Sequence, residues 1–255
     1  MKADILGVKI DNLKEKEVIY AVRKKIAKKE KFWIATPNPE MIVLAQKDLQ
    51  FKRILNSADL AIPDGIGLVW AGRILGREIR ERVSGVDLME KLCQVGSQNG
   101  WSVYLIGGKP EVAKTALEVL KKRYPGLKGW AETGPELEVG SGKWEVGRKK
   151  GGVGSGKWIE KINQKEPTIL FVGFGMGKQE RWVAKYFDIL NIGGAMVVGG
   201  AFDFISGRAL RAPILIQDLG LEWLWRLIQE PWRIKRQLAL GRFVFLVLKE
   251  RLSLL

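Results

Sequence analysis

The sequence predicts an α/β protein of the Rossmann-like class, with a parallel sheet flanked by helices and a helical C-terminal appendage. Through residue 207, short apolar runs rich in β-branched residues alternate with segments of helical periodicity. The apolar runs carry few charges, as expected for strands that are buried on both faces. Several of these runs end in clusters of glycine, proline and polar residues, and ligands bind at the carboxyl ends of strands in open α/β sheets.

The expected elements alternate along the chain. We expect strands at Phe32–Ala35, Leu60–Ile62, Ser102–Ile106, Thr168–Val172 and Ala195–Val198. We expect helices at Lys16–Lys28, Glu40–Ala45, Ile66–Leu75, Asp87–Val95, Glu111–Lys122 and Gln179–Leu190. We therefore assign residues 1–207 to an α/β domain and residues 208–255 to the appendage.

One segment does not fit the alternation. Residues 133–158 are rich in glycine and contain the string VGSGKW twice, from Val139 and from Val153. Long loops inside compact domains are uncommon. We expect a surface excursion here, after which the helical pattern resumes near Trp158.

The composition excludes several kinds of chemistry. The 255 residues include no histidine and one cysteine, so the chain has no imidazole base, no Ser-His triad and no internal disulfide. A general base must then be a carboxylate or, less often, lysine, tyrosine or cysteine. The formal net charge of +15 favours polyanionic partners such as nucleic acid, anionic lipid or phosphorylated substrates. No apolar run has the length of a membrane span, so we expect a cytoplasmic protein.

The string TPNPE closes the first expected strand. Its prolines hold the chain extended, and Thr36 and Asn38 then present neutral donors and acceptors suited to the hydroxyl or amide groups of a sugar. The alternative is a rigid turn in which Asn38 caps the next helix.

The string PDGIG follows the second expected strand. Asp64 lies at the carboxyl end of this strand, and the flanking glycines leave room for a ligand. Its carboxylate can accept a proton from an attacking hydroxyl group. The alternative is that Asp64 caps the helix that begins at Ile66.

Arg82, in the string RVSG, precedes another expected helix. A guanidinium group binds phosphate in forked geometry. The alternative is a solvated arginine, since its neighbours are mostly charged.

Two glycine-rich strings, GGKPE (Gly107–Glu111) and GFGMGKQE (Gly173–Glu180), each follow an expected strand and open an expected helix. Backbone amides at such positions attract phosphate groups, which predicts a nucleotide diphosphate site. A plain turn is the alternative for either string. The sequence has no Asp-x-Asp pair to hold a metal ion, so we expect no metal site and no cofactor. The residues assigned to nucleotide binding are Gly107, Gly108, Lys109, Gly173, Gly175 and Lys178.

The appendage combines basic and aromatic residues. Leu221, Trp225, Ile228 and Trp232 form one apolar stripe at helical spacing, and Pro231 is expected to separate two helices. This pattern is typical of a helix that lies in the plane of a membrane surface. The alternatives are a helical hairpin packed on the domain and an oligomer interface. The residues assigned to membrane contact are Trp223, Arg226, Trp232, Arg233 and Arg236.

Taken together, these strings resemble the WecG/TagA/CpsF family of bacterial glycosyltransferases, most closely the TagA-type N-acetylmannosaminyltransferases. The matching strings occur in the family's order: TPNPEMIVLAQKD, LAIPDGIGLVWAGRILG, ERVSGVDL, VYLIGGKPEVA, ILFVGFGMGKQERW, GGAFDFISGRALRAP and GLEWLWRLIQEPWR. The resemblance implies an inverting, metal-independent transfer, commonly of N-acetylmannosamine from its UDP form onto undecaprenyl-diphosphate-linked N-acetylglucosamine. In Gram-positive bacteria this step builds the linkage unit of wall teichoic acid.

The family pattern implies roles for particular residues. Asp64 would be the catalytic base, and Thr36 and Asn38 would help to form the sugar pocket. Arg82 and Gln179 would lie near the active site and meet the diphosphate. The C-terminal tail of the family is associated with attachment to the membrane, which here would mean the inner face of the cell membrane.

Other interpretations stay open. A member of the same family that uses another UDP-hexose has the same motifs. The net charge also fits a nucleic-acid-binding α/β protein, although we favour a protein with no nucleic-acid partner because the polar clusters gather at strand ends. The oligomeric state is not predicted.

Overall fold

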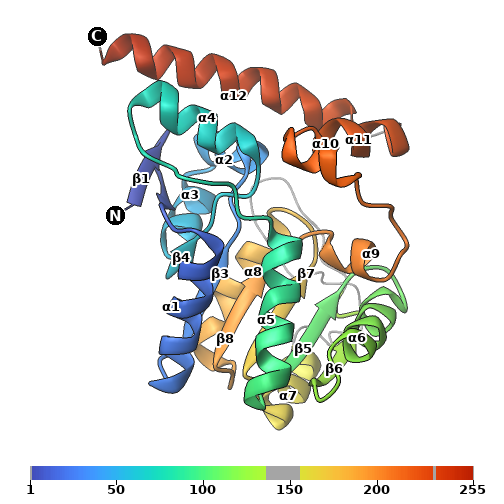
Figure 1. The fold of residues 1–255 in the computed structure, drawn as a ribbon. Helices are drawn as coiled ribbons and strands as arrows, with labels where there is room; N and C mark the ends of the chain where they lie inside the picture. The colour runs from blue at the N-terminus through green and yellow to red at the C-terminus, as the bar shows by residue number, and fades with distance from the viewer. Residues whose placement is uncertain (1, 136–155, 232–233, 255) are drawn as a thin grey trace, which may run out of the picture. The chain divides into compact units, whose positions relative to one another are not determined.

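The computed structural model describes residues 2–135, 156–231 and 234–254 of the chain (Figure 1). Their internal contacts define two compact units. The first unit comprises Met1–Val18, Ala35–Ser84 and Ala209–Leu255, and the second comprises Ile19–Ile34 and Gly85–Arg208. The C-terminal segment therefore shares a unit with segments from the first third of the sequence.

A six-stranded sheet has the order β4-β3-β8-β7-β5-β6. The described pairs β3–β8, β8–β7, β7–β5 and β5–β6 are parallel. The predicted α/β class, with a parallel sheet flanked by helices, is confirmed (Figure 1). The strands are β3 (Phe32–Ala35), β4 (Leu60–Ala61), β5 (Ser102–Gly107), β6 (Lys128–Glu132), β7 (Ile169–Gly173) and β8 (Gly194–Val197).

The central strands form the middle of the core. Every residue of β7 and β8 is buried, and so is β5 after its first residue. Strands buried on both faces need continuous apolar sequence, and these three strands were predicted for that reason. The edge strand β6 was not expected, because it is half-exposed and carries charged residues at both ends.

Among the described residues, the helical segments that belong wholly to the second unit are α5 (Gly85–Asn99), α6 (Val112–Arg123), α7 (Gly156–Lys165), α8 (Lys178–Tyr186), the 3₁₀ turn η1 (Phe187–Ile189) and α9 (Ala201–Ile205). The expected helix Gln179–Leu190 is thus shorter than predicted. It ends where the backbone tightens, since the N–H of Leu190 donates to the carbonyl oxygen of Phe187 at 3.3 Å.

The first unit begins with an antiparallel hairpin of β1 (Lys2–Ile5) and β2 (Val8–Asp11), which was not expected from the sequence. The short helix α3 was also unexpected. Around Pro231 the chain forms two helices, as predicted. The helices of this unit are α2 (Pro39–Lys47), α3 (Leu49–Asn56), α4 (Ile66–Leu75), α10 (Ile214–Asp218), α11 (Glu222–Gln229) and α12 (Ile234–Ser253), while α1 (Glu15–Ala27) is divided between the units.

Candidate functional site

In the first unit, three loops of the chain meet at the segment Pro63–Asp64. The backbone N–H of Asp64 donates to the carbonyl oxygen of Pro37 at 2.8 Å. On the other side, the N–H of Val83 donates to the carbonyl oxygen of Pro63 at 3.0 Å. These bonds continue the pairing beyond β3 and β4. They bring together the segments that carry four predicted site residues: Thr36, Asn38, Asp64 and Arg82.

Asp64 is partly exposed, at the start of the loop that leads into α4. The residue in the N-cap position of α4 is Gly65, with a φ of 118°, so Asp64 lies one residue before the cap. A φ in this region is accessible to glycine but strained for other residues. The alternative in which Asp64 caps the helix is therefore not what the structure adopts.

Asn38 does cap a helix. Its Oδ1 accepts a hydrogen bond of 3.0 Å from the backbone N–H of Met41, and Pro39 occupies the first turn of α2. Side chains that satisfy a free N–H at a helix start stabilise the helix. Thr36 is buried, with 6% of its surface exposed. Binding of a sugar by these two residues stays a prediction.

Arg82 is not a solvated side chain, because only 17% of it is exposed. Its guanidinium forms an ion pair with Glu222 of α11 and donates to the carbonyl oxygen of Gln217 at 3.3 Å. Arg211 pairs with the same carboxylate at 3.3 Å. Reasoning from the sequence did not find Arg211 or Glu222, because their partner Arg82 lies more than a hundred residues away along the chain.

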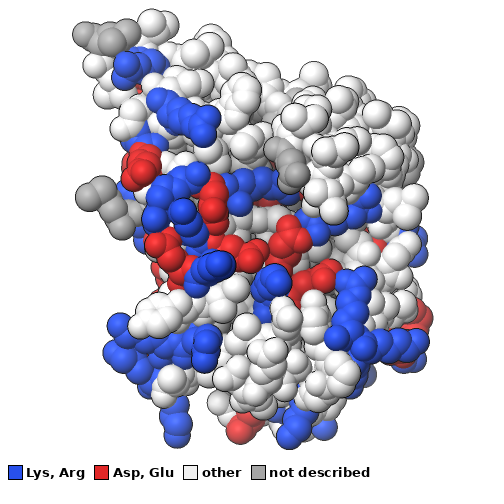
Figure 2. Space-filling view, in the orientation of Figure 1, with Lys and Arg blue, Asp and Glu red and all other residues white. Residues whose placement is uncertain are grey.

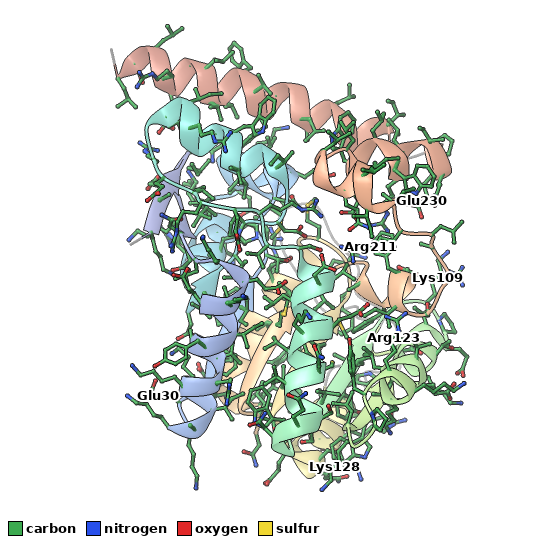
Figure 3. All side chains as sticks on the ribbon, in the orientation of Figure 1. Glu30, Lys109, Arg123, Lys128, Arg211 and Glu230 are labelled. Atoms are coloured by element: carbon green, nitrogen blue, oxygen red, sulfur yellow. The ribbon has the colours of Figure 1, made fainter. Side chains whose placement is uncertain are left out.

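In the second unit, the ends of β5 and β7 pack backbone against backbone. The strand register pairs Gly107 with Gly173, and the N–H of Gly108 donates to the carbonyl oxygen of Gly173 at 3.0 Å. A Cβ atom on Gly107 would lie 2.5 Å from that same oxygen, and the φ of Gly107 is +123°. These glycines therefore have a structural role in the close approach of two strands. The neighbouring Lys109, labelled in Figure 3, is exposed.

The loop after β7 turns at Gly175 into α8. Gly175 has a φ of +85°, and no atom of the described residues lies within 4 Å of the position that a Cβ would take. The backbone N–H groups of Lys178 and Gln179 both donate to the carbonyl oxygen of Gly175 at 3.2 Å. The open space beside Gly175 is what close approach of a ligand requires.

Gln179 belongs to a buried hydrogen-bond network. Its Oε1 accepts from the backbone N–H of Gly199 at 3.0 Å, and its Nε2 donates to Glu180 Oε1 at 2.8 Å. The other carboxylate oxygen of Glu180 accepts from the N–H of Gly177 at 2.6 Å. Burial raises the pKa of Glu180 to about 7, although these hydrogen bonds oppose the shift. The network fixes the start of α8 against the loop that follows β8.

Sequence reasoning missed Glu180 as a member of this site. The signal was present, because a glutamate three residues into a helix is a capping residue. What the spacing did not reveal is that its carboxylate is completely buried.

The helices of the C-terminal segment expose many apolar side chains. Trp223 of α11 is 42% exposed and Phe245 of α12 is 64% exposed. Where α10 and α11 lie in Figure 1, the surface in Figure 2 consists mostly of uncharged residues. Within the described ranges no helix has the length and hydropathy that crossing a membrane requires. Arg226 pairs with Glu230 at 3.3 Å, whereas Trp232, Arg233 and the side chain of Arg236 lie outside the described residues.

One face of α12 packs inside the first unit, against α2 and α4. Phe243 and Val247, one helical turn apart, are buried there. This face of α12 therefore packs on the domain, as in the alternative of a helical hairpin packed there. The opposite face, which includes Phe245, is open.

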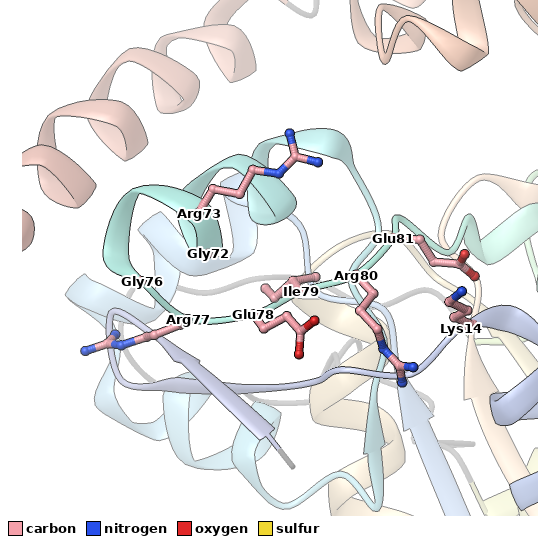
Figure 4. Close-up of a pocket in the computed structure, with 9 residues that line it drawn as sticks. All are labelled: Lys14, Gly72, Arg73, Gly76, Arg77, Glu78, Ile79, Arg80 and Glu81. Carbon is pink, nitrogen blue, oxygen red and sulfur yellow. The ribbon is translucent and has the colours of Figure 1, made fainter.

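A hollow of about 520 Å³ opens in the first unit beside the end of α4 (Figure 4). It is lined by Lys14, Gly72, Arg73, Gly76, Arg77, Glu78, Ile79, Arg80 and Glu81. None of the predicted site residues is among these lining residues. Over the part of the chain that the structure describes, no group of three or more acidic or cysteine side chains is placed to hold a metal ion.

A parallel sheet with polar and glycine-rich loops at the carboxyl ends of its strands defines an α/β protein of the Rossmann-like class. Proteins of this class bind their ligands outside the carboxyl ends of the strands. More narrowly, the chain belongs to the glycosyl transferase WecG/TagA/CpsF family, whose family model matches residues 3–255.

Curated relatives agree with this membership. A Bacillus subtilis (strain 168) protein named N-acetylglucosaminyldiphosphoundecaprenol N-acetyl-beta-D-mannosaminyltransferase is 31% identical over 85% of this chain and 79% of its own length. A relative of the same name from Bacillus spizizenii is also 31% identical, over 87% of this chain and 80% of its own length. A third, from Staphylococcus aureus (strain MW2), is 26% identical over 98% of this chain and 93% of its own length.

Proposed function

We propose that this protein transfers N-acetylmannosamine from UDP-N-acetylmannosamine to N-acetylglucosamine linked to undecaprenyl diphosphate, in the synthesis of wall teichoic acid or a related surface polysaccharide. The family membership and the names of the relatives support the reaction class. The observation that carries the mechanism is the meeting of three loops at Asp64, since it places a partly exposed carboxylate beside the segments of Asn38 and Arg82.

In the proposed mechanism, the acceptor hydroxyl oxygen attacks the anomeric carbon of the donor sugar. Asp64 takes the proton of that hydroxyl group as the new C–O bond forms. The bond between the anomeric carbon and the phosphate oxygen breaks, and UDP leaves with the electron pair. A single displacement of this kind inverts the configuration.

The departing UDP requires stabilisation of its negative charge. Arg82 and the amide groups at the starts of helices supply it in this proposal, without a metal ion. Thr36 and Asn38 hold the sugar, and Gln179 lies near the diphosphate. The nucleotide-binding roles of Lys109, Lys178 and the glycines at the ends of β5 and β7 are part of the same proposal.

We further propose that α11 and α12 attach the protein to the inner face of the cell membrane, where the lipid-linked acceptor lies. The exposed apolar side chains of these helices support attachment in the plane of the surface. Anionic headgroups contribute about 1 kcal/mol for each nearby Lys or Arg, and the segment from Arg208 is rich in arginine. The division into an α/β domain of residues 1–207 and an appendage of residues 208–255 belongs to this proposal.

The test is a transfer assay with a short-chain lipid-diphosphate acceptor and a panel of UDP-sugars. We expect turnover with UDP-N-acetylmannosamine above that with other UDP-hexoses, in a buffer that contains a metal chelator. Asp64→Asn, which keeps the shape of the side chain, should lower kcat by about 10²–10⁴-fold. Near-normal turnover by Asp64→Asn, with a fold as stable as that of the parent protein, would refute the role of Asp64.

A further inference from the structure

Two guanidinium groups of the first unit share one carboxylate. Glu222 Oε2 forms an ion pair with Arg82, and Glu222 Oε1 lies 3.3 Å from Nε of Arg211. All three side chains are mostly buried, with between 17% and 24% of each exposed. Arg211, labelled in Figure 3, lies in the stretch that leads into α10, and Glu222 opens α11.

The shared carboxylate leaves Arg82 incompletely satisfied. A carboxylate carries one negative charge, whereas the two guanidinium groups beside it carry one positive charge each. Two neutral acceptors also lie beside these groups: the carbonyl oxygen of Gln217 accepts from Arg82 and Oγ of Ser84 accepts from Arg211, both at 3.3 Å. Among the described residues, Nε of Arg82 is buried without a hydrogen-bond partner. A buried donor left unpaired costs free energy.

The helix that supplies Glu222 is weakly held. No residue of α11 is buried, and Ile228 on this helix is 69% exposed. On the same helix, Nε1 of Trp225 is buried without a hydrogen-bond partner among the described residues. The docked position of α11 therefore leaves two buried donors unsatisfied, one on Arg82 and one on the helix itself. Moving Glu222 away disturbs little apolar packing.

A phosphate group fits the two arginines better than a carboxylate does. It offers more charge and more acceptor oxygens in the geometry that guanidinium groups prefer. We propose that Arg82 and Arg211 together form a binding site for a phosphate group of the nucleotide donor, and that Glu222 occupies this site until the phosphate displaces it. The inference rests on the proposed function, to which it adds a second cation and an internal competitor.

Removal of a carboxylate changes the affinity for the ligand in opposite directions in the two possible roles. A carboxylate that only positioned the arginines would help the ligand, so its removal would weaken binding. A carboxylate that competes with the ligand opposes it, so its removal strengthens binding. The Glu222→Gln variant keeps the size of the side chain and removes the charge, and it distinguishes the two roles.

The test is calorimetric titration of the full chain and its variants with UDP, uridine and inorganic pyrophosphate. Glu222→Gln should bind UDP about fivefold more tightly than the parent protein, as expected for the loss of one partly exposed ion pair. Arg211→Gln should bind UDP more weakly, and uridine should bind the parent protein and Glu222→Gln alike. Unchanged or weaker UDP binding by Glu222→Gln overturns the proposal.

Two controls complete the design. Glu250→Gln removes one carboxylate from an arginine pair elsewhere in the same unit, since Glu250 lies 2.7 Å from Arg77. It changes the net charge equally and should leave the affinity for UDP as it is, so a gain equal to that of Glu222→Gln would also overturn the proposal. Should Glu222→Gln unfold, Glu222→Ala is titrated in its place with the same expected sign.

If the proposed donor is wrong, the titrations give a different result. In that case UDP binds neither the parent protein nor any variant. The pyrophosphate titration then decides the inference alone. Tighter pyrophosphate binding by Glu222→Gln than by the parent supports it, and equal binding overturns it.

Discussion

The side-chain amide of Gln179 donates a hydrogen bond of 2.8 Å to the carboxylate of Glu180, which is completely buried. The orientation of this amide is determined by its partners. The backbone N–H of Gly199 can only donate, so it must face Oε1 of Gln179, and the carboxylate then receives Nε2. A proposed substrate-binding residue is thus held in one orientation by a buried carboxyl group and a backbone amide.

We first predict that Glu180 makes the stability of the protein depend on pH. Burial raises its pKa from 4.5 to about 7, so between these values the folded state binds a proton that the unfolded state has released. The contribution is fully present below pH 4.5 and is lost as the pH rises through about 7. The free energy of unfolding should fall across this interval, by up to about 1.4 kcal/mol per pH unit.

The measurement is urea unfolding at a series of pH values, for the parent protein and for Glu180→Gln. The variant has no titrating group at this position, so the difference between the two proteins isolates the glutamate. This difference should shrink as the pH rises from 4.5 to about 7. A difference that stays constant would mean that the carboxylate is ionised throughout, and the explanation would be wrong.

A second prediction concerns Gly107. A Cβ atom there would lie 2.5 Å from the carbonyl oxygen of Gly173, and the φ of +123° is unfavourable for alanine. Gly100 has a φ of +70°, and the described part of the chain places no atom within 4 Å of its Cβ position, so it is a control for the backbone alone. Gly100→Ala should cost about 1–2 kcal/mol. Gly107→Ala should cost clearly more, measured by urea unfolding, because the clash adds to the strain. Equal costs would exclude the close approach as the reason for glycine.

A third prediction separates the two roles of Asn38. Its side chain caps α2, and loss of such a cap costs about 1 kcal/mol. Asn38→Asp keeps the cap but loses the amide that we assign to the sugar, so it should keep the stability of the parent and lose most transferase activity. Asp48 caps α3 in the same way, through Phe51 at 2.8 Å. Asp48→Ala should lose stability and keep its activity under conditions where it is folded. If Asn38→Asp turns over like the parent, Asn38 is a helix cap only.

The sequence predicted every strand of the six-stranded sheet except the edge strand β6, and it missed the separate β1–β2 hairpin. β5, β7 and β8 are buried on both faces, and burial of that kind requires apolar runs that are easily read. The β1–β2 hairpin was missed because its turn is Leu6–Gly7, with both residues at positive φ. Leucine is unfavourable in that region, and with Leu6 before Gly7 the usual Asn-Gly or Asp-Gly signal of a hairpin was absent.

The candidate site likewise contains residues that the sequence indicated and residues that it did not. Asp64 and Asn38 were proposed from the sequence because each lies just after an expected strand. Glu222 and Arg211 were missed because their roles depend on Arg82, which tertiary structure alone brings to them. Local patterns identify residues at strand ends, whereas partners from distant segments need the fold.

The last prediction uses the two faces of α12. Phe243 is 4% exposed and Phe245 is 64% exposed, and two residues along a helix they point in nearly opposite directions. Phe243→Ala should lower the free energy of unfolding by about 3–5 kcal/mol, because it empties a packed position against α2 and α4. Phe245→Ser should leave that free energy within about 0.5 kcal/mol of the parent value.

In the proposed membrane attachment, Phe245 contributes to binding of the membrane and not to the stability of the fold. Phe245→Ser should weaken binding to vesicles that contain anionic lipid, measured by co-sedimentation, because an apolar side chain on the open face is lost. Leu252 is 71% exposed on the same helix, and Leu252→Ser should act in the same direction. Ile189, in the second unit, is 59% exposed, and Ile189→Ser is a control for the loss of one exposed apolar side chain elsewhere. If both serine variants of α12 bind vesicles like the parent, the open face of α12 is not the surface that meets the membrane.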